Sequence, residues 1–151
     1  ALGVPEHAID KGRVRECVRM AQALDFVQQS LPQGFDTTIG ERGVRISGGQ
    51  RQRLGIARAL YNDPAVVVFD EATSALDSLT EREVMDAIGV LRHSKTVLIV
   101  AHRMQTIREC DMLVMMREGH IEAMGTYDSL VETNPAFRAL ATGSANGLLA
   151  S

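Results

Sequence analysis

Two short apolar runs stand out from the mixed polar and apolar pattern of the rest of the chain. Residues 65–69 read Ala-Val-Val-Val-Phe and residues 96–101 read Thr-Val-Leu-Ile-Val-Ala, and neither run contains a charged side chain. Continuous runs of this length, rich in β-branched residues, are typical of strands in a parallel sheet that is covered on both faces. We therefore predict two strands here, the first of them buried on both faces.

Three other stretches show the spacing of apolar side chains that is typical of amphipathic helices. They are residues 10–28, the stretch from Gln50 to about Tyr61, and residues 80–92. Residues 62–64, Asn-Asp-Pro, end the second of these helices, because Pro disfavours helical backbone at the residue before it. In the third helix, Val84, Ile88 and Leu91 are expected to face the core.

The last third of the chain predicts a hairpin followed by short helices. Met112–Met116 reads as a strand, residues 117–119 (Arg-Glu-Gly) as a turn, and residues 120–124 as the returning strand. Thr126 is expected to begin a helical piece, and Asn134 with the proline after it to begin a last helix. Together with the preceding strands and helices, this order predicts an α/β fold.

Composition narrows the class of protein. The chain has 151 residues, 45% of them hydrophobic, and a formal net charge of −3, which suits one globular domain and gives no sign of non-specific nucleic-acid binding. Two cysteines are too few for a disulfide framework or a zinc site, so a reducing cytosolic setting is the default. No apolar run approaches the roughly 18 residues that a membrane helix needs, so any spanning part is expected elsewhere.

Groups suited to binding phosphate and metal flank the first strand. Ser47, Gly48 and Gly49 precede a helix, where free backbone amides and the helix dipole favour an anion. Asp70 and Glu71 follow the strand, at the edge where open α/β sheets bind their ligands. Taken separately, the first group is more commonly a helix cap and the second a solvated loop.

In this order and spacing, the residues resemble the ATP-binding cassette (ABC) ATPases. Residues 47–50 (Ser-Gly-Gly-Gln) match the signature motif, Val66–Asp70 the Walker B strand, and residues 74–77 (Ser-Ala-Leu-Asp) the D-loop. The resemblance covers residues 1 to about 142. It implies a P-loop NTPase-like, three-layer α/β fold with a parallel sheet, present here in part, and a helical signature subdomain. The implied division is a helical portion at 1–61, a catalytic core portion at 62–142 and a flexible tail at 143–151.

Three residues are expected to take part in the hydrolysis of ATP. Asp70 is placed to hold Mg²⁺ through a water, since magnesium retains several of its waters in proteins. Glu71 lies one residue further and is expected to accept a proton from the attacking water. A lone histidine after a strand is usually a turn residue. His102, however, follows the second strand, where the family has a switch histidine that contacts the γ-phosphate, and the resemblance carries that role to His102.

The resemblance also implies that the site is shared between two copies of the domain. In the family, two nucleotide-binding domains enclose two ATP molecules head to tail. Ser47, Gly48, Gly49 and Gln50 would then bind the nucleotide held by the partner domain, and Asp77 would couple the two sites.

One motif that the family requires is not found. No stretch matches G-x-x-x-x-G-K-[ST], the P-loop whose backbone and lysine hold the phosphates. The adenine-stacking aromatic residue and the glutamine loop are missing too, and the chain begins at Ala1. The chain is therefore expected to be the C-terminal part of a longer nucleotide-binding domain. Alone, it is expected to be poorly soluble, to bind ATP weakly or not at all, and to be inactive.

Within the family, the chain most resembles exporters. Ala72 after the glutamate, the Gly-Glu-Arg-Gly segment at 40–43 and the Gln-Arg-Gln-Arg sequence at 50–53 favour an exporter over an importer. The implied function is ATP hydrolysis coupled to export of a lipid-like or amphipathic substrate, as in flippases or multidrug exporters. The implied place is the cytoplasmic face of a membrane, against a transmembrane domain that Glu41 and Arg42 contact, unless those two residues belong only to a solvated charged loop.

Two other functions remain open on the sequence alone. One is a soluble cassette ATPase that acts on nucleic acid or ribosomes, which would need coiled-coil insertions or basic arms that the chain does not show. The other is a non-catalytic, truncated remnant that only binds a partner. Retention of Asp70, Glu71 and His102 argues against decay.

Overall fold

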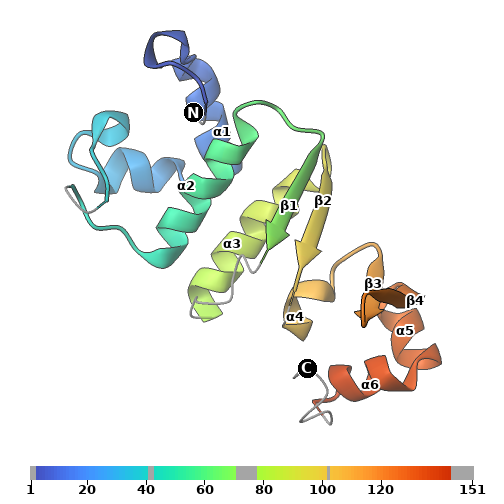
Figure 1. Cartoon of the computed structure of the whole chain (residues 1–151). Coiled ribbons are helices and arrows are strands. Elements are labelled where there is room, and N and C mark those ends of the chain that lie inside the picture. The colour runs from blue at the N-terminus through green and yellow to red at the C-terminus, as the bar shows by residue number, and fades with distance from the viewer. Residues whose placement is uncertain (1–2, 41–42, 71–77, 102, 144–151) are drawn as a thin grey trace. The chain divides into compact units, whose positions relative to one another are not determined.

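The computed structural model divides the chain into two compact units (Figure 1), and each is described by itself. The units are Ala1–Val100 and Ala101–Ser151. The residues that the structure describes are 3–40, 43–70, 78–101 and 103–143. The predicted boundary between helical and catalytic portions near residue 61 stays a prediction.

Three helices and a pair of strands make up the first unit. They are α1 (Lys11–Met20), α2 (Gly48–Leu60), α3 (Ser78–Leu91), β1 (Val66–Asp70) and β2 (Thr96–Val100). Short helical turns lie at Glu6–Ala8, Phe26–Ser30 and Gly34–Asp36. The helices α2 and α3 and the two strands lie within a residue or two of their predicted places, and the first helix does not.

The first helix is shorter than its apolar pattern predicts. Asp10 caps its start, since the side-chain Oδ1 accepts hydrogen bonds from the amides of Gly12 (2.7 Å) and Arg13 (3.1 Å). The helix then ends at Met20, and Gln22 takes a left-handed conformation with φ of 50°. A single helix over residues 10–28 is therefore wrong: the buried Ala21 and Ala23 pack in a turn, and a π-helical turn follows.

The parallel pair β1–β2 is covered on one face. Val67 and Phe69 of β1 are buried in one apolar core with α1, α2 and α3, which lie on the same side of the strands (Figure 1). Val84, Ile88 and Leu91 of α3 are buried in that core, as predicted.

The opposite face of these strands is exposed. It carries apolar side chains at 49–60% exposure: Val66, Val68, Leu98 and Val100. The prediction that β1 is buried on both faces is wrong for this chain. Side chains alternate along a strand, and no described helix of the unit covers the second face.

The second unit is a hairpin packed on helices. Its elements are α4 (Met104–Ile107), β3 (Leu113–Arg117), β4 (His120–Gly125), α5 (Tyr127–Thr133) and α6 (Pro135–Ala141). Glu118 and Gly119, both with positive φ, form the two-residue turn between the antiparallel strands. Thr126 caps α5, and Asn134 caps α6 by accepting a 2.9 Å hydrogen bond from the amide of Phe137, as predicted.

The core of this unit is small. Leu113, Leu130 and Phe137 are buried together, and the ring of Tyr127 packs edge-on against that of Phe137. Across both units, none of the helices in the described ranges is long and apolar enough to span a membrane.

Candidate functional site

The signature residues form the start of α2. The hydroxyl of Ser47 accepts a hydrogen bond from the amide of Gln50 at 3.2 Å, and the Gln50 side-chain oxygen accepts one from the amide of Ser47 at 2.9 Å. This reciprocal capping box fixes the first turn of the helix. The interpretation of these residues as a helix cap is therefore correct.

The cap leaves donors available for an anion. A serine hydroxyl has one hydrogen to donate besides its two acceptor sites, and in the cap Ser47 serves only as an acceptor. The amides of Gly48 and Gly49 lie in the first turn, where no carbonyl of the same helix can reach them. Ser47 and Gly48 are exposed, whereas Gly49 is buried. Capping and phosphate binding are thus compatible at this helix start.

Gln50 has a supporting position in the motif. Its side-chain oxygen accepts a hydrogen bond from the amide of Ser47, which uses one of the two acceptor sites of that oxygen. The direct nucleotide contact expected for Gln50 stays a prediction, and the structure gives the residue a second task, which is to hold Ser47 in place.

Asp70 lies at the C-terminal end of β1, as predicted. It is exposed, and it pairs in register with Val100, the last residue of β2. The two parallel strands therefore end together at the same edge of the sheet. The carboxylate of Asp70 makes no ion pair with a described side chain. It therefore suits a hydrated Mg²⁺, which needs an accessible oxygen ligand.

Glu71, Asp77 and His102 lie outside the described residues, as do Glu41 and Arg42. The roles given to these five residues stay predictions. Among the described residues, no cluster of histidine, cysteine or acidic side chains could hold a metal by itself.

Arg53 is a residue whose importance the sequence did not reveal. Its Nη2 lies 3.0 Å from Oε2 of Glu83 in α3, and its Nη1 donates a 2.9 Å hydrogen bond to the carbonyl oxygen of Gln22. The side chain is 15% exposed. Arg53 is part of the Gln-Arg-Gln-Arg sequence at 50–53. The partners of Arg53 are distant in the chain, and no local pattern predicts them.

A separate apolar cavity of about 200 Å³ lies between α1, α2 and the segment that joins them. Val14, Cys17, Phe35 and Leu54 are among its lining residues. Burial raises the pKa of the Cys17 thiol, which keeps it protonated at neutral pH. The lining has too few polar groups for a triphosphate, so the cavity is not the nucleotide site.

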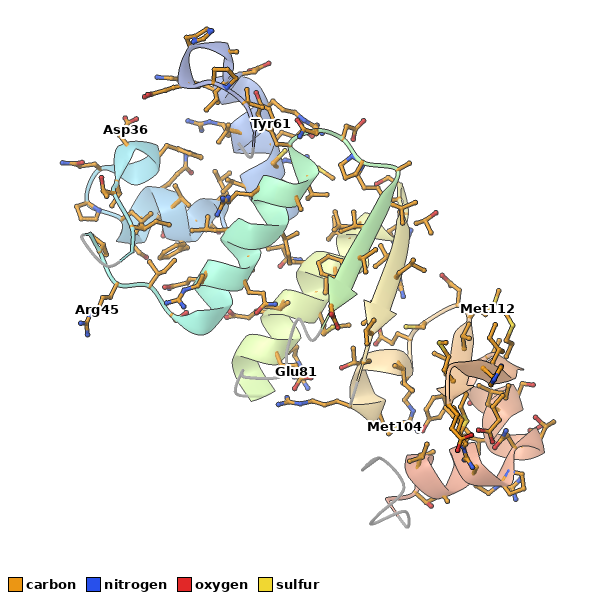
Figure 2. The ribbon with its side chains drawn as sticks, viewed as in Figure 1. Asp36, Arg45, Tyr61, Glu81, Met104 and Met112 are labelled. Carbon is orange, nitrogen blue, oxygen red and sulfur yellow. The ribbon has the colours of Figure 1, made fainter. Side chains whose placement is uncertain are left out.

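The opposite end of α2 is anchored by Tyr61. Tyr61 lies just after the last residue of α2 (Figure 2), and its hydroxyl accepts a 2.8 Å hydrogen bond from the amide of Asp10 at the start of α1. The C-terminal end of the helix that presents the signature residues is therefore tied to α1.

Comparison with known proteins places these features in a family. A family model described as "ABC transporter" matches residues 4–74, which include the signature and Walker B residues. The heterocyst differentiation ATP-binding protein HepA of Nostoc sp. is 49% identical over 122 residues, which are 81% of this chain and 20% of that protein. The ATP-dependent lipid A-core flippase of Hahella chejuensis is 48% identical over 128 residues, which are 85% of this chain and 22% of the flippase.

A solved structure agrees with the sequence relatives. A bacterial Atm1-family ABC exporter with ATP bound matches 96% of this chain with a TM-score of 0.77 and 31% identity, and the match covers 25% of that exporter chain. The chain thus spans about a fifth to a quarter of the length of these proteins. The match confirms the predicted α/β class and the exporter resemblance. The chain belongs to the ABC transporter family and corresponds to part of the ATP-binding domain of its exporters.

Proposed function

We propose that this chain supplies the signature motif and the hydrolytic carboxylates of a domain that couples ATP hydrolysis to export across a membrane. The observation that carries the proposal is the position of Asp70. It is an exposed carboxylate at the C-terminal end of β1, level with the end of the parallel strand β2. Open α/β sheets bind their ligands at this edge.

The role proposed for each residue follows from its chemistry. Asp70 would hold Mg²⁺ through water, and the ion would neutralise charge on the phosphates of ATP. Glu71, the next residue, is the general base that takes a proton from the attacking water. His102 contacts the γ-phosphate from the end of the neighbouring strand.

The signature residues act on a second nucleotide. Ser47, Gly48 and Gly49 offer a hydroxyl and two amides to the ATP bound by a partner domain in a head-to-tail pair, with Gln50 holding Ser47 and Asp77 coupling the two sites. The capping box supports this arrangement, because it fixes Ser47 without using its hydrogen.

The substrate class and the membrane partner are inferred from the relatives. The 48% identity to a protein named as a lipid A-core flippase supports a lipid-like or amphipathic substrate. We infer that a transmembrane domain is the second partner, with Glu41 and Arg42 against it, and that the chain lies at the cytoplasmic face of the membrane. The exporter names of the relatives favour this function over a soluble cassette that acts on nucleic acid.

A chimera tests the proposal. In the chimera, this chain replaces the aligned 128-residue segment of the Hahella chejuensis flippase. The flippase sequence upstream of that segment is kept. The chimera, purified in detergent and folded, is expected to hydrolyse ATP in the presence of Mg²⁺, and Asp70→Asn is expected to abolish the activity. A folded chimera that binds ATP but hydrolyses none would contradict the proposal.

A further inference from the structure

We propose that the ion pair between Arg53 and Glu83 is a positioning device that sets the orientation of the signature helix α2 against α3. The inference rests on the proposed function, since it assigns the pair a part in ATP turnover. Neither residue is expected to touch the nucleotide.

The first observation is how Arg53 is held. From α2, the guanidinium of Arg53 contacts two other segments: it lies 3.0 Å from Glu83 of α3 and donates a 2.9 Å hydrogen bond to the carbonyl oxygen of Gln22. Gln22 lies just after α1 in a left-handed conformation, with φ of 50°. The planar fork of an arginine suits this arrangement, because its donors are rigidly spaced.

The second observation is the burial of the charge. The side chain of Arg53 is only 15% exposed, and its Nε is buried with no hydrogen-bond partner in the described part of the chain. A buried donor without a partner is unfavourable, so packing and the two other contacts must hold the side chain in place. By contrast, the Glu16–Arg19 pair is 51% and 65% exposed and lies within the single helix α1.

The third observation is where the pair lies along the helices. Arg53 is the sixth residue of α2, and Glu83 is the sixth residue of α3. Each therefore lies about 7.5 Å along the axis from the first residue of its helix. The start of α2 is the signature motif, and α3 begins at Ser78, the residue that follows Asp77 of the D-loop in sequence.

A consequence follows for the site. Because the pair joins the second turns of the two helices, a rotation of α2 that moves the hydroxyl of Ser47 strains the contact to Glu83. The signature residues and the start of α3 are thereby kept in one orientation. Breaking the pair leaves every proposed nucleotide contact chemically intact but allows the helix start to shift.

The test uses Glu83→Gln in the flippase chimera, with Glu16→Gln as the matched control, because both replace the acid of an ion pair by its neutral isostere. Glu83→Gln is expected to lower kcat for ATP about 2- to 30-fold, with KM within about twofold of the parent. Glu16→Gln is expected to match the parent. Arg53→Lys, which keeps the charge but loses the fork, is expected to fall between the parent and Glu83→Gln.

Amide hydrogen exchange in α2 gives a readout that does not depend on activity. The first two turns of α2 are expected to exchange faster in Glu83→Gln than in the parent, and no faster in Glu16→Gln. A parent chimera without ATPase activity would count against the proposed function. The exchange comparison would still test whether the Arg53–Glu83 ion pair positions α2.

The inference is overturned if α2 exchange is unchanged in Glu83→Gln. It is also overturned if exchange rises while kcat per folded molecule equals that of Glu16→Gln, since the pair would then serve stability alone.

Discussion

Lys95 donates a 2.7 Å hydrogen bond from Nζ to Oδ1 of Asp63, and a second one of 2.9 Å to the carbonyl oxygen of Pro64. Arg13 approaches the same Oδ1 at 3.3 Å and donates to the carbonyl oxygen of Leu60 at 3.0 Å. The loop from α2 to β1 is thus tied to α1 and to the start of β2. This network lies at the N-terminal end of the strands, away from Asp70, and its role is to hold the scaffold.

The network predicts a pH dependence of stability. The hydrogen bond and charge of Lys95, and then the charge of Arg13, lower the pKa of Asp63 from its ordinary value of 3.8. A lowered folded-state pKa contributes stability that is fully present above the unfolded pKa and is lost as the pH falls through the folded pKa. The contribution of Asp63 should therefore be complete above about pH 5 and should be lost progressively as the pH falls below 3.8 and through the lowered pKa of the folded state.

Urea unfolding of the chimera's ATP-binding domain between pH 3 and pH 7 measures this effect. Asp63→Asn should be less stable than the parent at pH 7, and the difference should shrink as the pH falls below 3.8. Asparagine suits the left-handed backbone at this position, where φ is 50°, so the variant isolates the charge. Asp36→Asn, at an exposed carboxylate, is the control. A stability difference that stays constant with pH would contradict the assignment.

The exposed face of β1 and β2 predicts that the 151-residue chain associates with itself when it is made alone. Four apolar side chains lie together there, and unpaired strand edges favour association. Val68→Thr combined with Leu98→Thr should increase the monomer fraction in size-exclusion chromatography with light scattering. Val67→Thr, on the buried face of the same strand, should not increase it. Equal monomer fractions for the parent and the double variant would count against this prediction.

Ser47 allows its capping and phosphate-binding roles to be separated. Ser47→Asp keeps a good cap, because aspartate accepts the amide of Gln50 equally well, but it places a negative charge where a phosphate is proposed to bind. The chimera carrying Ser47→Asp should keep its melting temperature and lose ATP hydrolysis. Ser47→Ala should lose the cap, at a cost of about 0.5–2 kcal/mol in stability.

The matched control at this position is Ser47→Thr, which keeps both the cap and the hydroxyl donor and should retain activity. Retained hydrolysis in Ser47→Asp would show that the residue is only a cap.

Local signals in the sequence were sufficient for much of the fold. Asn134 followed by proline and Thr126 before a helical run are short-range signals, and the structure confirms both caps. The strands were found for the same reason, since their apolar runs are continuous. The end of α1 was missed, because Gln22 in a left-handed conformation carries no composition signal of the kind glycine gives.

Burial and contacts that depend on residues far apart in the sequence could not be predicted. Whether Val66 and Val68 are covered depends on what packs against the sheet, and a strand's own residues do not encode that. The contacts of Arg53 with Glu83 and of Lys95 with Asp63 join segments far apart in sequence. Asp70 was predicted at the correct edge of the sheet, because that position follows from the strand's own end.

The rate of ATP hydrolysis by the chimera with Glu71→Gln shows whether this chain carries the hydrolytic base. Glutamine keeps the size of the side chain but cannot accept the proton of the attacking water, so turnover should fall about 100-fold or more. Binding of Mg-ATP, measured by equilibrium titration, should be unchanged, and Glu16→Gln should hydrolyse ATP at the parent rate. Hydrolysis by Glu71→Gln within a few-fold of the parent would contradict the claim that this chain carries the hydrolytic base.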